Sequence, residues 1–209
     1  GYIADLATQV LAADPAITSL PNHEQTVAFR EAGYQLQLRQ QQKTLNSFHT
    51  YFDSWFSERS LHADGGVDRA LEKLRGQGHV YELDGAVWLR TTDFGDDKDR
   101  VLVKANGDLT YFASDCAYYV NKRDRGFTTC LYLLGADHHG YVNRLKAVAA
   151  CAGDDPAITI EVLIGQVVKT MRDGKEVKLS KRAGEIVTLT DLVDEVGVDA
   201  ARYTLIRYP

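Results

Sequence analysis

Two apolar segments on either side of a helix-length stretch constrain the fold of this chain more than any other feature. Residues 130–134 form an uninterrupted apolar run, which is typical of a strand buried on both faces of a parallel sheet. Residues 158–164 predict a second buried strand, and residues 141–152 between them predict a helix. Strand, helix and strand in this order predict a βαβ unit and an α/β fold. Ligands of such sheets bind beyond the carboxyl ends of the strands.

The first part of the chain has a helical pattern. Apolar residues recur at helical spacing from Ile3 to Leu11, and Pro15 and Pro21 then interrupt the pattern. We expect a long helix over residues 24–56 and a short one over residues 67–74. We therefore predict a helical region over residues 1–78, followed by an α/β region with a β-hairpin insertion over residues 79–209.

The predicted hairpins begin directly after this helical region. Strands over residues 80–83 and 86–89 flank Asp84-Gly85, a strong two-residue hairpin signal. A second pair is expected over residues 100–104 and 109–112, followed by a helix with Ser114 as its N-cap. Later in the chain we expect a hairpin over residues 167–177 and a last helical region capped by Thr190.

Composition excludes several classes of protein. The chain has 209 residues and a formal net charge of −5, which does not favour sequence-blind binding of nucleic acid. No apolar run approaches the roughly 20 residues of a membrane-spanning helix, so no membrane partner is expected. The three cysteines lack metal-ligand spacing and are typical of reduced thiols in a cytoplasmic protein.

The segment after the first predicted strand, Gly135-Ala136-Asp137-His138-His139-Gly140, has the composition of a ligand-binding loop. A glycine there lets a ligand approach the backbone, and a carboxylate can accept two hydrogen bonds from a ribose diol. The following helix would present unpaired N–H groups to the ligand. Adjacent histidines do not face one another on a helix, so metal binding is disfavoured. The alternative is that both histidines only cap the helix.

Tyr111 and Asp115 are four residues apart at a predicted strand-to-helix junction. If both side chains point into a cleft, they present a phenol and a carboxylate to one ligand. A partly buried carboxylate of this kind suits a guanidinium, which it can bind through two hydrogen bonds. Alternatively, Asp115 only stabilises the first turn of the helix.

The segment Lys178-Leu179-Ser180-Lys181-Arg182 carries three cations and a hydroxyl between Gly174 and Gly184. Lysines on a loop can neutralise the charge that develops on a phosphate in a transition state. The alternative is a solvated surface cluster.

This basic segment resembles the second signature of class I aminoacyl-tRNA synthetases. Further segments resemble the bacterial arginyl-tRNA synthetases, and they follow in order along the chain. They are residues 55–61 (Trp-Phe-Ser-Glu-Arg-Ser-Leu), 92–100 (Thr-Asp-Phe-Gly-Asp-Asp-Lys-Asp-Arg), 110–115 (Thr-Tyr-Phe-Ala-Ser-Asp), 135–141 and 198–203. The resemblance implies part of a Rossmann-like parallel sheet with a helical and β-hairpin insertion. It assigns residues 1–78 to the helical insertion and residues 79–209 to the second half of the nucleotide-binding catalytic domain, which contains the β-hairpin insertion.

The resemblance also implies site residues, substrates and partners. It places Tyr111, Asp115 and His138 at the substrate arginine, with Asp115 on the guanidinium. It places Gly135, Asp137 and His138 at the adenosine of ATP. Lys178, Ser180 and Lys181 would stabilise the phosphates during catalysis, and Mg²⁺ would arrive with ATP, held mainly by phosphates and water. The implied partners are L-arginine, ATP and tRNA(Arg), and the implied full-length enzyme is a monomer.

The first signature of class I synthetases, His-x-Gly-His, is absent from the sequence. We therefore expect the 209 residues to be a fragment that is inactive alone, with an exposed apolar flank that favours self-association. Two other interpretations remain open: another class I nucleotidyl-transferring enzyme, or a non-catalytic module that binds tRNA or protein.

Overall fold

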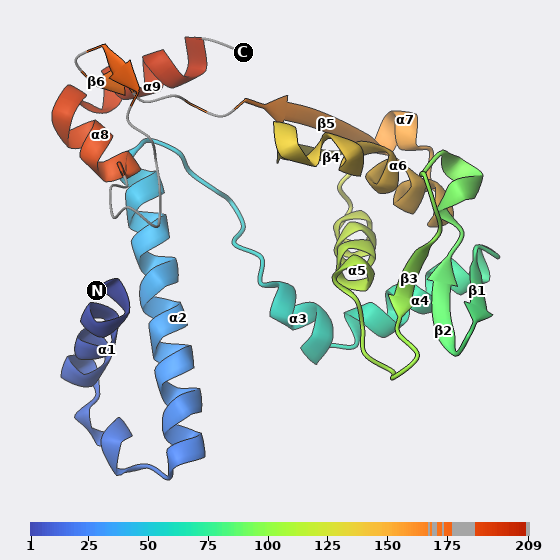
Figure 1. Ribbon diagram of the computed structural model, residues 1–209, viewed down its shortest axis with the longest axis horizontal. Helices are drawn as coiled ribbons and strands as arrows, with labels where there is room; N and C mark the ends of the chain where they lie inside the picture. Colours follow the sequence, from blue (N-terminus) through green and yellow to red (C-terminus); the bar gives the residue numbers. More distant parts are fainter. Residues whose placement is uncertain (167, 169–170, 173, 177–186, 208–209) are drawn as a thin grey trace. The chain divides into compact units, whose positions relative to one another are not determined.

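The computed structural model describes residues 1–166, 168, 171, 172, 174–176 and 187–207 (Figure 1). The chain divides into two compact units. Unit 1 comprises Gly1–Asp53 and Lys169–Tyr208, and unit 2 begins at Ser54 and extends to Val168. The predicted division at residue 78 stays a prediction, and each unit is described by itself below.

Unit 1 contains a helical hairpin formed by α1 (Tyr2–Ala13) and α2 (Asn22–Ser47), joined by the 3₁₀ helix η1 (Pro15–Ser19). Gly33 of α2 lets the two helices approach, since a Cβ there would meet Leu6 Cδ2 at 3.5 Å. The later part of the unit contains the short strands β6 (Met171–Arg172) and β7 (Lys175–Glu176), α8 (Leu189–Val196) and α9 (Val198–Arg207). Pairing of β6 with β7 confirms the hairpin predicted around Gly174.

Two boundaries predicted in unit 1 are wrong. The long helix ends at Ser47 rather than Phe56, because a Schellman motif with His49 in the left-handed region terminates it. The Arg202 guanidinium stabilises this end from α9 by donating to the carbonyl oxygens of Phe48 and His49, at 2.7 and 3.1 Å. The N-cap of α8 is Thr188 rather than Thr190, since Thr188 and Asp191 form a capping box.

Unit 2 opens with two short helices, α3 (Glu58–Ala63) and α4 (Gly66–Gly76). The predicted hairpin follows as β1 (Val80–Leu83) and β2 (Ala86–Leu89), with positive φ at both Asp84 and Gly85. After the 3₁₀ helix η2 (Thr91–Phe94), β3 (Arg100–Val103) pairs with β2 and completes an antiparallel sheet. The predicted strand over residues 109–112 is wrong: Leu109 forms only an isolated bridge, and α5 (Tyr111–Asp124) begins at Tyr111.

The predicted βαβ unit is confirmed. Strands β4 (Cys130–Gly135) and β5 (Ile160–Gly165) pair in parallel, with Gly135 opposite Gly165, so both strands end at one edge. The chain between them forms the 3₁₀ helix η3 (Ala136–Tyr141), α6 (Val142–Cys151) and the short α7 (Pro156–Thr159).

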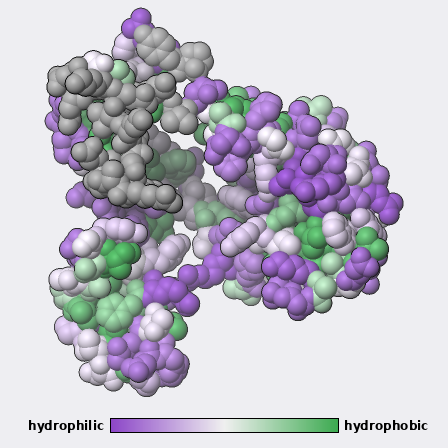
Figure 2. Space-filling model, viewed as in Figure 1, coloured by the Kyte–Doolittle hydropathy of each residue, from purple (hydrophilic) through white to green (hydrophobic). Residues whose placement is uncertain are grey.

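The prediction that this parallel sheet is buried on both faces is wrong for the described residues. Cys130 and Ile160 face the core, whereas Leu131, Leu133 and Leu163 on the alternate face are 49%, 73% and 46% exposed. Side chains in a strand alternate between the two faces, so the apolar run supplies one covered face and one free face. On the visible surface of unit 2, hydrophobic side chains lie among mostly hydrophilic ones (Figure 2).

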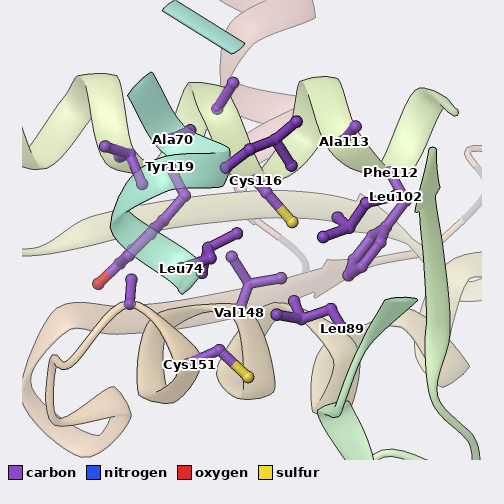
Figure 3. Packing of buried hydrophobic residues seen from close by; sticks show 14 of the residues in the cluster. Ala70, Leu74, Leu89, Leu102, Phe112, Ala113, Cys116, Tyr119, Val148 and Cys151 are labelled. Atoms are coloured by element: carbon purple, nitrogen blue, oxygen red, sulfur yellow. The ribbon is translucent and has the colours of Figure 1, made fainter. Parts of the chain in front are cut away.

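The core of unit 2 lies between its helices and its antiparallel sheet. Leu74 of α4, Cys116 of α5, Val148 of α6 and Leu89 of β2 converge there (Figure 3). Leu74 and Leu89 are fully buried. This core fixes α5, whose N-terminal part carries two of the predicted site residues, against α4 and α6.

Candidate functional site

The N-terminal part of α5 carries Tyr111, its first residue, and Asp115 one turn later. Thr110 is the N-cap, and its hydroxyl accepts a hydrogen bond from the N–H of Ala113. The prediction of Ser114 as the N-cap is therefore wrong, because the helix starts earlier. As a result, Tyr111 and Asp115 lie one turn apart on the same helix, where residues i and i+4 are neighbours. Tyr111 is 93% exposed.

A cleft with a volume of about 470 Å³ opens beside this turn, a size in the range of small-molecule sites. Helix α3 contributes Glu58 and His62 to its lining, and α5 contributes Tyr111 and Ser114. His62 Nε2 lies 3.1 Å from the buried hydroxyl of Ser114, which ties α3 to α5. Glu58, at the first position of α3, is thereby held close to the first turn of α5.

Asp115 is surrounded by groups that act on its charge in opposite directions. Burial raises the pKa of Asp115 above the ordinary value, and the nearby Glu58 carboxylate raises it further. A hydrogen bond from the Tyr141 hydroxyl to Asp115 Oδ2 acts the other way, as do the more distant charges of Arg144 and Lys122. The raised pKa of Asp115 and the negative charge of Glu58 make a site whose charge a bound cation would neutralise.

The two cations near Asp115 both have other partners. Arg144 lies over the ring of Tyr141, with its Cζ 4.4 Å from the ring centroid. Lys122 lies between the rings of Tyr118 and Tyr132, with Nζ 4.1 Å from each centroid. Burial lowers the pKa of Lys122. Both cations are therefore held against aromatic rings, and both still lower the pKa of Asp115.

The segment 135–140 follows β4 directly, as predicted. It forms η3, and α6 then begins at Val142, one residue after the predicted start of the helix. Asp137 folds back over Gly135, where a Cβ would lie 2.6 Å from Asp137 Oδ1, so a larger residue would displace the carboxylate. His138 is exposed, and its Nε2 lies 3.6 Å from Asp137 Oδ2. An exposed carboxylate and imidazole at the end of a parallel strand are available to a ligand.

The structure links two of the predicted segments, the start of α5 and residues 135–141. Asp115 of α5 and the end of the 135–141 segment are joined by the Tyr141 hydrogen bond. Lys178, Ser180 and Lys181 lie outside the described residues. In the described ranges there is no group of three histidine, cysteine or acidic side chains placed to hold a metal ion.

Sequence reasoning did not identify Glu58, Tyr141 and Arg144 as site residues. Glu58 and Tyr141 lie inside quoted family-like segments, but neither carried a local signal for a role. Arg144 looks like an ordinary cation of an amphipathic helix. Their roles depend on contacts between segments that lie far apart in the sequence.

Unit 1 holds a larger cleft of about 630 Å³ between α2 and α8. Amides and hydroxyls dominate its lining, including Gln37, Gln41 and Thr190. Its carboxylate Asp191 is engaged by Thr188 in the capping box. We assign the candidate site to unit 2, where Glu58 and Tyr111 line an open cleft. Asp115 does not line that cleft but lies one helical turn beyond Tyr111.

A parallel βαβ unit with polar residues after its strands is the arrangement of a nucleotide-binding enzyme of the α/β class. The family model described as tRNA synthetases class I (R), catalytic domain, matches residues 20–206. The chain therefore belongs to the family of class I arginyl-tRNA synthetases, as a part of the catalytic domain.

Individual relatives agree with this assignment. The chain is 57% identical over 206 residues to a protein named arginine–tRNA ligase from Frankia alni, covering 99% of this chain and 37% of that protein. A second protein of that name, from Renibacterium salmoninarum, is 57% identical over 208 residues, again with 37% of its length covered. The chain thus spans little more than a third of the curated relatives it matches.

Solved structures are similar as well. A Campylobacter jejuni arginyl-tRNA synthetase structure superimposes with a TM-score of 0.85 and 33% identity, over 97% of this chain and 43% of that one. The Thermus thermophilus arginyl-tRNA synthetase, at 18% identity and a TM-score of 0.65, shares the fold. In the parts of the chain that the structure describes, no helix is long and apolar enough to span a membrane.

Proposed function

We propose that this chain takes part in ATP-dependent activation of L-arginine and its transfer to tRNA(Arg). The observation that carries the proposal is the Asp115 carboxylate, which the Tyr141 hydroxyl holds and whose pKa is raised by burial and by the charge of Glu58. A guanidinium between the two carboxylates would replace their repulsion with charge-assisted hydrogen bonds. An uncharged side chain of similar size would leave that repulsion in place, which is a physical basis for selecting arginine.

The proposed chemistry begins with in-line attack of the arginine carboxylate on the α-phosphate of ATP, which releases pyrophosphate. A hydroxyl of the terminal ribose of the tRNA then attacks the carbonyl carbon of the arginyl-adenylate, which forms the ester, breaks the acyl–phosphate bond and releases AMP. In this proposal Tyr111, Asp115 and His138 contact arginine, while Gly135, Asp137 and His138 hold the adenosine. Lys178, Ser180 and Lys181 stabilise the phosphates, and Mg²⁺ enters as part of the ATP substrate.

The proposal extends to the state and location of the protein. We propose that the full-length enzyme is a monomer and that it is located in the cytoplasm. The three buried, free cysteines of the described chain agree with this location. The 209 residues alone should be inactive and should self-associate. The exposed Leu131, Leu133 and Leu163 on one sheet face support this expectation.

Pyrophosphate exchange tests the proposal. The chain would replace the matching region of the Frankia alni relative, to which it is 57% identical, and the product is called the chimera below. We expect arginine-dependent ATP–pyrophosphate exchange by the chimera in the presence of tRNA(Arg), and none by the 209 residues alone. An inactive but folded chimera, or exchange driven equally well by lysine, would count against the proposal.

A further inference from the structure

The proposed function gives no role to one of the quoted sequence segments, residues 92–100. This segment contains Asp96, whose side chain is only 2% exposed and is held by Arg100 through two hydrogen bonds of 2.7 and 2.8 Å. Burial would raise the pKa of Asp96, but the hydrogen bonds from Arg100 and from the N–H of Asp97 outweigh it and lower the pKa well below the ordinary range. Asp96 is therefore a fixed, buried negative charge.

This fixed charge lies next to Arg144 of α6. Arg144 Nε is 3.9 Å from Asp96 Oδ2, and it is a buried nitrogen without a hydrogen-bond partner among the described residues. The guanidinium is thus oriented by the charge of Asp96 on one side and by the face of the Tyr141 ring on the other. Arg144 in turn restricts the position of that ring.

Tyr141 connects this arrangement to the candidate site. The residue ends η3 and is half-buried, and its hydroxyl donates to Asp115 Oδ2. A carboxylate with one oxygen held by a fixed donor presents its other oxygen in a defined direction. A guanidinium binds best to a carboxylate whose oxygens have a fixed direction, because its own N–H donors form a rigid planar fork.

We infer that Arg144 and Tyr141 are positioning residues, which transmit the fixed orientation of buried Asp96 to the Asp115 carboxylate and so set its geometry for a guanidinium ligand. This inference rests on the proposed function, since it concerns the same carboxylate. It gives segment 92–100 a role in the site although no residue of that segment lines the cleft beside α5. Asp96 itself is a poor target for a variant, because removing it would leave the buried Arg100 with only the exposed carboxylate of Asp97 as an ion-pair partner.

Four variants of the chimera test the inference: Tyr141→Phe, Arg144→Met, the double variant and Arg144→Lys. We expect each of the first two to raise the KM for arginine about three- to tenfold, the effect of one lost hydrogen bond, with the KM for ATP unchanged. In the Tyr141→Phe background, Arg144→Met should add nothing, because Arg144 acts through Tyr141. Arg144→Lys should recover part of the loss, because it retains a cation beside Asp96. Lys146→Met, at an exposed cation of the same helix, is the matched control.

Several results would overturn the inference. Additive effects of Tyr141→Phe and Arg144→Met would show that the two residues act independently. Equal changes in both KM values, accompanied by a fall in melting temperature, would show a purely structural role. Asp115→Asn separates the two levels of the account: if it leaves the KM for arginine unchanged, the proposed function fails. If it raises that KM while the Tyr141 and Arg144 variants do not, only the positioning role fails.

Discussion

Replacing Asp115 by asparagine removes a charge and leaves the shape of the side chain almost unchanged. The asparagine oxygen can still accept the Tyr141 hydrogen bond, so the contact between α5 and η3 should persist. The raised pKa of Asp115 means that its ionised form destabilises the folded state above that pKa. Asp115→Asn should therefore leave the melting temperature at neutral pH unchanged or slightly higher.

The effect on arginine should be large by comparison. A hydrogen bond to a charged partner contributes about 1.5–3 kcal/mol, against about 0.5–1.5 kcal/mol for a neutral pair. If the side chain at position 115 makes two such bonds to a guanidinium, the binding free energy of arginine would be about 2–3 kcal/mol weaker with asparagine than with aspartate. Because Asp115 is partly exposed, solvent screening favours the lower figure, which corresponds to about 30-fold weaker binding.

Isothermal titration of the chimera with arginine, and with ATP, would measure this effect. We expect the Kd for arginine to rise about 30-fold and the Kd for ATP to stay constant. Asp124→Asn, at the other end of α5, serves as the control. An Asp115→Asn variant with full arginine affinity would refute the reasoning that this carboxylate holds the guanidinium.

Three further outcomes are expected. Arginine affinity should be constant above the pKa that Asp115 has in the ligand-free protein, which is raised above the ordinary value of 3.8. Below that pKa the affinity should fall about tenfold per pH unit, because only the ionised carboxylate binds a cation. Asp115→Asn should remove this pH dependence. Leu74→Ala, at a fully buried position, should lower the free energy of unfolding in urea by about 2–5 kcal/mol, whereas Leu83→Ala, at a 50% exposed position, should cost far less; similar losses would contradict the assigned core. Leu133→Lys should reduce self-association of the 209 residues in sedimentation velocity without altering their circular dichroism, and undiminished association would exclude the exposed sheet face as the contact.

Much of unit 2 could be predicted from the sequence because its signals are local. Asp84-Gly85 predicted the β1–β2 turn, and the apolar runs predicted both parallel strands with their common edge. The same runs misled us about burial, because an apolar strand does not itself determine what covers each face. Thr110 was missed as the N-cap of α5 because Ser114, four residues later, is an equally suitable residue type.

Other features depend on distant parts of the chain. The end of α2 is stabilised by Arg202, more than 150 residues away, and no local pattern predicts that interaction. The site has both kinds of feature. Residue type and the family resemblance are enough to identify Asp115. Its neighbours Glu58 and Tyr141 come from α3 and η3, so only the folded chain reveals them.

A crystal structure of the chimera with bound arginine would test the central claim most directly. We expect the guanidinium nitrogens within hydrogen-bonding distance of Asp115, with Glu58 beside them and the Tyr141 hydroxyl still on Asp115 Oδ2. Arginine bound elsewhere, with Asp115 and Glu58 facing only solvent, would contradict the account.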